Sequence, residues 1–288
     1  MYNEDGDNMK TCLVLEGGAL RGIYTAGVLD TLQKENIVVD TIIGVSMGSI
    51  CGINYVSNQI GRTLRYNLKY CKDKNYMSYH NLIKTGDIVN NHFAYDTIPN
   101  QLDLFDYDAY KCRKTKFLCT VTNIETGEAE YIEIKDPKKE IDYIKAGASM
   151  PVVSSIVEID NKKYLDGGIA DSIPVKKAIS LGYDKIIVVL TRPITYRKRK
   201  SKNKTLQRPY KEYPNLQKAL EVRNENYNKT VEEIIKLEEE GKILVIRPTR
   251  KVKIKRIEHN PTRIQEQYDL GVEDCKAKIK EVKKYLKI

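Results

Sequence analysis

Residues 41–48 read Thr41-Ile42-Ile43-Gly44-Val45-Ser46-Met47-Gly48, and this stretch decides the fold. The β-branched residues at its start predict a short buried strand, and the small, apolar residues from Met47 to Tyr55 predict a buried helix. Gly44 to Gly48 is a G-x-S-x-G sequence, in which glycines relieve crowding around a serine on a sharp strand-to-helix turn. The same pattern also occurs by chance in ordinary turns. The strand–turn–helix context is therefore what favours Ser46 as a nucleophile.

A second glycine-rich turn lies upstream. Cys12 to Leu15 predicts a first strand, a helical pattern runs from Ile23 to about Leu32, and between them stands Glu16-Gly17-Gly18-Ala19-Leu20-Arg21-Gly22. The N–H groups of such a turn bind anions, and in acyl transfer the anion is the oxygen of the tetrahedral intermediate. The spacing matches neither the G-x-G-x-x-G of dinucleotide sites nor a P-loop. A structural turn without a ligand is the alternative, but two such turns in succession meet at the sheet edge where open α/β folds place their sites.

The third motif is Asp166-Gly167-Gly168. Ile156 to Ile159 and Lys162 to Leu165 predict two strands joined by the turn-forming pair Asp160-Asn161, so that Asp166 stands at the end of the second strand. Gly167 and Gly168 would let the carboxylate pack close to the serine turn. Asp-Gly-Gly is also a common turn, and only its combination with the two upstream motifs, in this order, favours Asp166 as a catalytic base.

The histidines fit the role of base less well. His80 and His92 precede Asp166, so His259 alone would give the Ser, Asp, His order of α/β-hydrolases. His259 lies in a basic, turn-like stretch with no strand leading into it, and too few strands precede Ser46 for an α/β-hydrolase. A carboxylate can act directly as the base when it lies within hydrogen-bond reach of the hydroxyl. We therefore expect a Ser46–Asp166 dyad without histidine.

Together, these segments resemble the patatin-like phospholipase family, whose pattern is an acidic or glycine residue before Gly-Gly-Gly-x-Arg/Lys-Gly, then G-x-S-x-G, then Asp-Gly-Gly/Ala. A fourth family segment, Ala-Ser followed closely by proline, corresponds to Ala148-Ser149-Met150-Pro151. The resemblance covers about residues 10–190 and implies a Ser–Asp dyad, with Ser46 as nucleophile and Asp166 as base.

The resemblance also implies roles for the glycine-rich turn. The N–H groups near Gly17, Gly18 and Ala19 would form the oxyanion hole, and Arg21 and Gly22 would support the loop. Gly44 and Gly48 would shape the nucleophile elbow, and Gly167 and Gly168 the base motif. One departure is Ala19, where many members have a third glycine. Alanine keeps the N–H group but tolerates positive φ poorly, so an imperfect oxyanion hole is expected if this position needs positive φ.

The composition is that of an ordinary enzyme. The chain has 288 residues, of which 41% are hydrophobic, enough for one large domain or a domain with an extension. The polar start, Met1 to Asp5, is unlike a secretory signal, and no run approaches the ~18 apolar residues of a membrane span. The six cysteines form no C-x-x-C and no metal-like cluster with histidine. We expect a cytoplasmic protein with no metal and no organic cofactor.

Two segments allow more than one interpretation. Residues 56–112 are rich in tyrosine and either pack an insertion or form a lid or acyl-binding wall over the site. Residues 192–208 hold eight basic and no acidic residues, a pattern typical of a solvated segment. That segment, Arg192 to Arg208, could contact an anionic membrane peripherally or nucleic acid, or be only a soluble loop; no specific nucleic-acid partner is expected.

We predict a three-layer α/β/α sandwich with a mainly parallel central sheet. Residues 10–190 would form the catalytic domain, and residues 191–288 a basic loop and a helix–strand–helix extension packed on the same fold. The expected activity is serine acyl hydrolysis of a lipid ester, such as a phospholipid or lysophospholipid, through an acyl-enzyme. An acyltransferase or general esterase would use the same site. A non-catalytic protein that binds anionic membranes or nucleic acid is the alternative of another class, and Ser46→Ala would not affect it.

Overall fold

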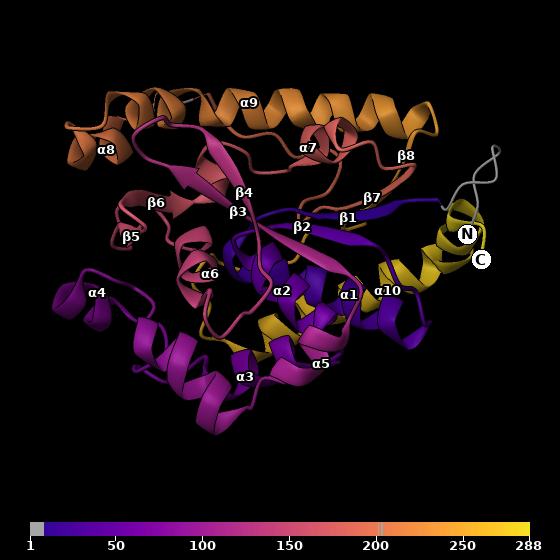
Figure 1. Cartoon of the computed structure of the whole chain (residues 1–288), viewed down its shortest axis with the longest axis horizontal. Helices are drawn as coiled ribbons and strands as arrows, with labels where there is room; N and C mark the ends of the chain where they lie inside the picture. The colour runs from indigo at the N-terminus through magenta and orange to yellow at the C-terminus, as the bar shows by residue number, and fades with distance from the viewer. Residues whose placement is uncertain (1–8, 201, 203) are drawn as a thin grey trace.

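The computed structural model describes residues 9–200, 202 and 204–288; the polar start Met1 to Asp5 and two positions in the basic segment, Ser201 and Asn203, lie outside them. The described residues form an eight-stranded mixed sheet in the order β5-β6-β3-β2-β1-β7-β8, with β4 paired to β3 (Figure 1). The strands span β1 Thr11–Leu15, β2 Thr41–Val45, β3 Lys116–Asn123, β4 Ala129–Glu133, β5 Val157–Ile159, β6 Lys162–Asp166, β7 Lys185–Val189 and β8 Ile243–Ile246. Strands β3, β2, β1, β7 and β8 are parallel, and β4, β5 and β6 pair antiparallel at one end.

Helices cover both faces of the sheet because successive strand residues point to opposite faces. In β1, Leu13 and Leu15 pack with α1 (Ile23–Lys34), α2 (Met47–Val56) and α10 (Pro261–Leu286), whereas Cys12 and Val14 pack with α7 (Val175–Ser180) and α9 (Pro214–Glu239). Figure 1 shows α7 and α9 above the sheet, and α1, α2 and α10 below it. The predicted α/β/α sandwich is confirmed.

Helices α1 and α10 cross with their backbones in direct contact. A Cβ added at Gly27 would lie 2.2 Å from the carbonyl oxygen of Tyr268, and one added at Gly271 would lie 2.1 Å from that of Tyr24. Side-chain hydrogen bonds flank the crossing, from Tyr268 to Asp30 at 2.8 Å and from Tyr24 to Asp274 at 3.0 Å. The C-terminal helix is therefore part of the layer that carries α2.

The register of the sheet places the ends of β2 and β6 opposite each other. Val45, the last residue of β2, pairs with Thr120, and Asp166, the last residue of β6, pairs with the next β3 residue, Val121. Strand β4 pairs with β3 over the same positions, so β2 and β6 share the other edge of β3. Because β2 runs parallel and β6 antiparallel to β3, their carboxyl ends point at one another.

The segment between β2 and β3 forms a helical subassembly beside the sheet. It contains α3 (Arg62–Tyr70), α4 (Tyr79–Thr85), the π-helix η2 (Phe93–Leu102) and α5 (Tyr107–Cys112). Three of its tyrosines, Tyr66, Tyr70 and Tyr76, form a small core with Ile98. Pro99 lies inside η2 and lacks the N–H group that a regular helix would need there.

The remaining short elements connect this framework. They are η1 (Ala19–Gly22), α6 (Ile141–Gly147), η3 (Gly167–Ile169), α8 (Lys204–Gln207) and η4 (Arg208–Tyr210). No helix within the described part of the chain combines the length and the hydropathy that crossing a membrane would need.

The expectation of a solvated segment at residues 192–208 is wrong at Lys198. Its backbone N–H donates to the Asn228 side chain at 2.8 Å, and its carbonyl accepts from the same amide at 2.9 Å. Its Nζ lies 3.9 Å from the centroid of the Tyr227 ring. Charge composition alone cannot predict this packing of Lys198. The Asn228 side chain on α9 bonds to its backbone N–H and carbonyl groups, and the Tyr227 ring binds its ammonium group by a cation–π contact.

Candidate active site

Ser46 occupies the turn between β2 and α2 with φ 54° and ψ −122°. This left-handed backbone is rare for a residue with a side chain and is the strained geometry of a nucleophile elbow. Ser46 is 7% exposed and stands at the N-terminus of α2, where the helix dipole favours negative charge. The G-x-S-x-G stretch therefore has the strand–turn–helix context that the sequence predicts.

The glycines around Ser46 allow three chain segments to meet. A Cβ added at Gly48 would lie 2.6 Å from the carbonyl oxygen of Leu15, and one added at Gly44 would lie 2.7 Å from the Cα of Ser49. Gly17 approaches Ser46 from the upstream loop, where an added Cβ would lie 3.2 Å from the serine Cβ. A side chain at Gly48 or Gly44 would push α2 away from the strands.

Asp166 ends β6 and is buried at 3% exposure. Its Oδ1 accepts a hydrogen bond from the Gly168 N–H at 2.7 Å, and its own N–H donates to the carbonyl of Ser149 at 2.8 Å. Burial raises the pKa of Asp166, while the Ser46 hydroxyl at the carboxylate and the charge of Arg223 lower it. The structure therefore brings Ser46 and Asp166 together, and the carboxylate is a stronger base than an exposed aspartate.

The Asp-Gly-Gly turn needs both glycines for close packing. A Cβ at Gly167 would lie 2.3 Å from the Thr120 carbonyl oxygen of the neighbouring strand. One at Gly168 would lie 3.0 Å from Oδ1 of Asp166 and 3.5 Å from a side-chain methyl group of Val45. The turn thus lies directly against the end of β2.

The glycine-rich loop after β1 presents two amides without an acceptor among the described residues. The Gly17 N–H donates to the Ser172 carbonyl at 3.3 Å, whereas no such contact engages the amides of Gly18 and Ala19. Ala19 has φ 49°, so this position does adopt the left-handed backbone that glycine favours. Ala19 keeps its N–H group in that conformation, which makes it a candidate oxyanion donor together with Gly18.

Arg21 and Gly22 lie where the same loop enters α1. The Arg21 N–H donates to the Gly18 carbonyl at 3.3 Å, and its own carbonyl accepts from Gln267 of α10 at 2.9 Å. Its buried Nε has no hydrogen-bond partner among the described residues. Burial and the charges of Arg192 and Arg256 lower the pKa of Arg21 to about 10. A Cβ at Gly22 would lie 2.6 Å from the Met47 side chain, so Gly22 lets the loop abut α2.

Glu16 ties the loop to the C-terminal part of the chain. It is 3% exposed, and its Oε2 accepts from the Thr191 N–H at 2.5 Å and from the Thr191 hydroxyl at 3.0 Å. Its Oε1 accepts from the Tyr227 hydroxyl of α9 at 2.8 Å. A carboxylate with three such hydrogen bonds is well satisfied despite its burial.

The sequence does not predict three cations around the candidate site: Lys198, Arg223 and Arg256. The Arg223 Nε donates to the Gly168 carbonyl at 2.6 Å. Arg256 lines the cavity beside Ser46, and its carbonyl accepts from the Leu20 N–H at 3.2 Å. A signal for Arg223 exists in the sequence, because it falls on the buried stripe of α9 that runs through Leu220 and Tyr227. For Lys198 and Arg256 no such pattern is present.

A cavity of about 150 Å³ lies beside Ser46. Its lining includes Ala19 and, from α2, α3 and η2, mainly apolar and aromatic side chains such as Ile50, Tyr66 and Ile98. The segment 56–112 therefore contributes a wall of this cavity as well as its own small core. A cavity lined in this way suits a hydrocarbon chain better than a polar group.

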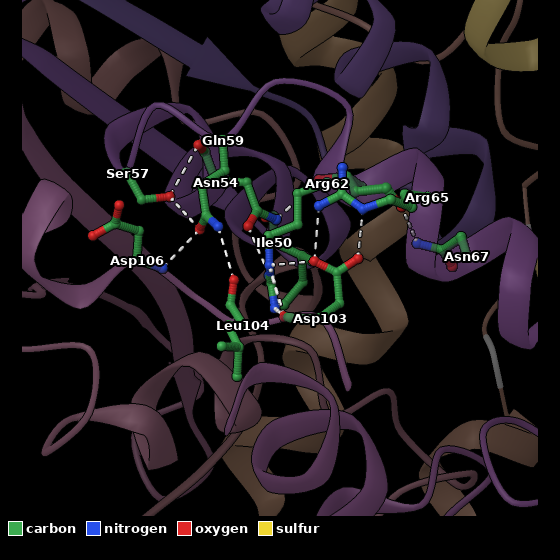
Figure 2. Close-up of polar contacts among 11 residues, drawn as sticks. Ile50, Asn54, Ser57, Gln59, Arg62, Arg65, Asn67, Asp103, Leu104 and Asp106 are labelled. Carbon is green, nitrogen blue, oxygen red and sulfur yellow. Dashed lines mark hydrogen bonds and ion pairs between the residues drawn. The ribbon is translucent and has the colours of Figure 1, made fainter. Parts of the chain in front are cut away.

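A polar network anchors that wall (Figure 2). The Arg62 guanidinium donates to the Asp103 carbonyl at 2.6 Å and to the Asn54 side chain at 2.8 Å, and Arg65 forms a two-point ion pair with the Asp103 carboxylate at 2.7 and 2.8 Å. Gln59 donates to the Leu104 carbonyl at 2.8 Å. These contacts fasten the chain after η2 to α2 and α3, and so fix one side of the cavity.

No histidine takes part in this arrangement. The Nδ1 of His259 lies 2.6 Å from the Cys71 carbonyl oxygen, His92 pairs with Asp96 at 3.4 Å, and His80 is exposed. Across residues 9–200, 202 and 204–288, no group of three His, Cys, Asp or Glu side chains is placed to hold a metal ion.

The part of the chain that carries the candidate site is similar to known proteins. The sequence matches the family model described as "Patatin-like phospholipase" over residues 13–179, and a second model, a domain of unknown function, over residues 213–287. The chain is 28% identical to an uncharacterized protein, YjjU, of Escherichia coli over 64% of its own length and 52% of that protein. It is 27% identical to a probable lipid hydrolase, 463L, of invertebrate iridescent virus 6, with coverage of 64% and 71%.

A fungal relative is the lysophospholipase nte1 of Aspergillus niger, with 28% identity over 62% of this chain and 11% of that protein. The chain thus spans about half of the E. coli relative and about a tenth of the fungal one. The family model covers more than half of the chain and every motif described above except the C-terminal contacts. The chain belongs to the patatin-like phospholipase family of hydrolases.

Proposed function

We propose that this protein hydrolyses the carboxylic ester of a phospholipid or lysophospholipid through a Ser46–Asp166 dyad. The observation that carries the proposal is the register of β3, whose adjacent residues Thr120 and Val121 pair with Val45 and Asp166. Two strands that point at each other along one edge deliver the serine and the carboxylate to the same place. Patatin-like lipid hydrolysis, which the family supports, needs a nucleophile and a base there.

In the proposed reaction, the Ser46 Oγ attacks the acyl carbonyl carbon while Asp166 takes the hydroxyl proton. The N–H groups of Gly18 and Ala19 stabilise the negative oxygen that forms. When the ester C–O bond breaks, the protonated Asp166 gives its proton to the leaving alcohol. Asp166 then removes a proton from water, whose oxygen attacks the acyl-enzyme. Asp166 returns this proton to the Ser46 Oγ as the bond between Oγ and the acyl carbon breaks, which releases the fatty acid and restores the Ser46 hydroxyl.

The apolar cavity beside Ser46 supports an acyl substrate. We propose that the acyl chain lies between α2 and the wall from residues 56–112, which places its carbonyl at Ser46. The names of two relatives, a lysophospholipase and a probable lipid hydrolase, favour the same substrate class. An acyltransferase would use the same acyl-enzyme but prefer an alcohol to water as the acceptor.

We further propose that residues 10–190 and 191–288 act as one catalytic unit, because β8 extends the sheet and α9 contacts the loop of Glu16. Action on a membrane lipid requires contact with its surface. The exposed cations between Arg192 and Arg208 favour peripheral binding to an anionic bilayer, and we propose that the protein acts at the cytoplasmic side of a membrane.

The test is hydrolysis of a lysophospholipid and of p-nitrophenyl esters of several acyl lengths by the full chain. Ser46→Ala and Asp166→Asn should each lower kcat/KM by roughly 1,000-fold or more, because either loss disables the acyl-transfer step. Matched controls are Ser155→Ala and Asp142→Asn at exposed positions, which should retain activity. Full activity in Ser46→Ala would overturn the proposal, as would full activity in Asp166→Asn.

A further inference from the structure

Three cations from the C-terminal part of the chain, Lys198, Arg223 and Arg256, gather beside the candidate dyad; we refer to them as the basic cluster. The Arg223 Nε donates to the Gly168 carbonyl, two residues after Asp166, and Arg256 lines the cavity at Ser46. The Nζ of Lys198 lies on the ring of Tyr227, whose hydroxyl donates to Glu16 at the start of the glycine-rich loop, and the charge of Lys198 lowers the pKa of Asp166. Three separate elements, the basic segment, α9 and the loop after β8, therefore present positive charge to one place.

Among the described residues, no member of the basic cluster forms a close ion pair, although the charges of Asp166 and Glu16 act on Arg223 and Lys198 from farther away. Within the described part of the chain, none of its three members has a carboxylate oxygen within 4.0 Å, although many surface cations do. The two buried carboxylates nearby are engaged, Glu16 by Thr191 and Tyr227, and Asp166 by Ser46 and Gly168.

The cations also act on one another. Burial first, and then the charges of Arg223 and Arg256, lower the pKa of Lys198 to about 7. Lys198 and Arg223 are half-buried, whereas Arg256 is exposed. Holding like charges close together costs free energy, and such arrangements occur at functional sites.

We propose that the basic cluster binds the phosphate of a lipid whose headgroup carries net negative charge, while the acyl chain occupies the cavity at Ser46. The proposal rests on the function proposed above and narrows its substrate class. Arginine and lysine are the side chains that bind phosphate best, by charge-assisted hydrogen bonds.

A zwitterionic choline headgroup fits this place less well. Recognition of a quaternary ammonium uses open aromatic faces. Here the protein's own cations cover the two nearby tyrosine rings: Arg192 lies 4.3 Å from the centroid of Tyr196, and Lys198 lies 3.9 Å from that of Tyr227. The two buried carboxylates described above, Glu16 and Asp166, already accept hydrogen bonds from the protein and are not free to pair with an ammonium group.

The test measures binding, separately from turnover, to the full chain carrying Ser46→Ala. Isothermal titration would compare dihexanoyl phosphatidic acid, dihexanoyl phosphatidylcholine and inorganic phosphate, with both lipids kept monomeric. Phosphatidic acid should bind roughly tenfold or more tightly than either other probe, because each charge-assisted hydrogen bond contributes about tenfold in Kd. Lys198→Gln and Arg256→Gln, each in the same background, should bring the ratio of the two lipid affinities toward one.

The matched control is Lys218→Gln, which removes the same charge from an exposed position on α9 and should preserve the preference. Equal binding of the two lipids would overturn the proposal, as would an equal loss in the Lys218 variant. Inorganic phosphate that binds as tightly as phosphatidic acid would show a free-phosphate site and overturn the lipid assignment. If instead the Ser46–Asp166 dyad is not catalytic, the hydrolysis assay of the previous subsection would show it. The titration measures binding alone and does not depend on turnover.

Discussion

Two residues with side chains hold left-handed backbone at the site, Ala19 with φ 49° and Ser46 with φ 54°. This conformation costs a non-glycine residue roughly 1–2 kcal/mol. Ser46 needs its hydroxyl, so the strain there accompanies the proposed chemistry. Ala19 contributes only an N–H group, and its methyl group is not required for that role.

Ala19→Gly should therefore raise the free energy of unfolding by about 0.5–1 kcal/mol, since glycine relieves the strain but adds entropy to the unfolded chain. Urea unfolding of the two proteins measures the difference. Ala26→Gly, the same change in the interior of α1, should lower stability by about 1 kcal/mol or more. A loss of stability in Ala19→Gly as well would contradict the strain assigned to this position.

Arg223 is a positioning residue, because it bonds to the Gly168 carbonyl and its charge lowers the pKa of Asp166. A base must be ionised, so activity falls as the pH drops through its pKa. Arg223→Gln should raise that pKa further, because the compensating charge is lost, and should move the acid limb of kcat/KM for a neutral ester to higher pH.

Arg223→Lys, which keeps the positive charge, should return the acid limb of the profile toward that of the wild type. The comparison separates electrostatics from packing. If Arg223→Gln lowers kcat/KM equally at every pH and leaves the limb in place, Arg223 acts on the fold alone.

At the scale of elements, the crossing of α1 and α10 depends on the absence of two side chains. Gly27→Ala or Gly271→Ala would drive a methyl group to within 2.2 Å or 2.1 Å of a backbone carbonyl oxygen. Backbone cannot yield as a flexible side chain does, so each variant should lose about 3 kcal/mol of stability, at or beyond the usual range for overpacking.

Thermal or urea unfolding tests this prediction. Gly241→Ala is the control: nothing lies within 4 Å of an added Cβ there, and only its φ of 68° opposes alanine. It should cost about 1 kcal/mol. If Gly271→Ala loses no more stability than Gly241→Ala, then α1 and α10 can move apart to accommodate a methyl group and the close crossing is not required.

Most elements that carry the site could be predicted from the sequence. The strand before Ser46, the helix after it and the hairpin ending at Asp166 follow from β-branched runs, periodicity and the Asp160-Asn161 turn, whose residues have φ of 51° and 62°. The position of the cavity wall that the polar network anchors could not be predicted from the sequence. It depends on a contact between Arg62 and Asp103, which lie 41 residues apart in the chain.

Across the whole molecule, the C-terminal segment reaches the candidate site through several contacts. Strand β8 pairs with β7, Gln267 of α10 donates to the Arg21 carbonyl, and Tyr227 of α9 donates to Glu16. The last of these joins residues 211 positions apart. The patatin-like family model ends at residue 179, so each of these contacts involves at least one residue beyond the part of the chain that it describes.

Tyr227→Phe should remove about 1–3 kcal/mol of stability, because it leaves a buried carboxylate oxygen without its donor. It should also lower kcat/KM, since Glu16 leads directly into the loop of Gly18 and Ala19. Tyr213→Phe, whose hydroxyl makes a 3.3 Å contact with Lys163 away from the loop, is the control. If both variants change stability and kcat/KM by the same small amount, the contact of α9 with Glu16 does not support the candidate site.

The meeting of Ser46 and Asp166 also belongs to this scale. Each motif can be recognised locally, but their adjacency depends on β2 and β6 sharing one edge of β3, and no residue pattern specifies that register. The same limit applies to the basic cluster, whose members come from three elements.

The most direct test of the dyad is the rate at which a fluorophosphonate labels the folded protein, with the labelled residue located by peptide mass spectrometry. We predict that Ser46 is labelled in the wild type and that labelling slows by roughly 100-fold or more in Asp166→Asn, because the base that activates the hydroxyl is lost. Labelling at another serine, or at Ser46 with the same rate in both proteins, would contradict the account.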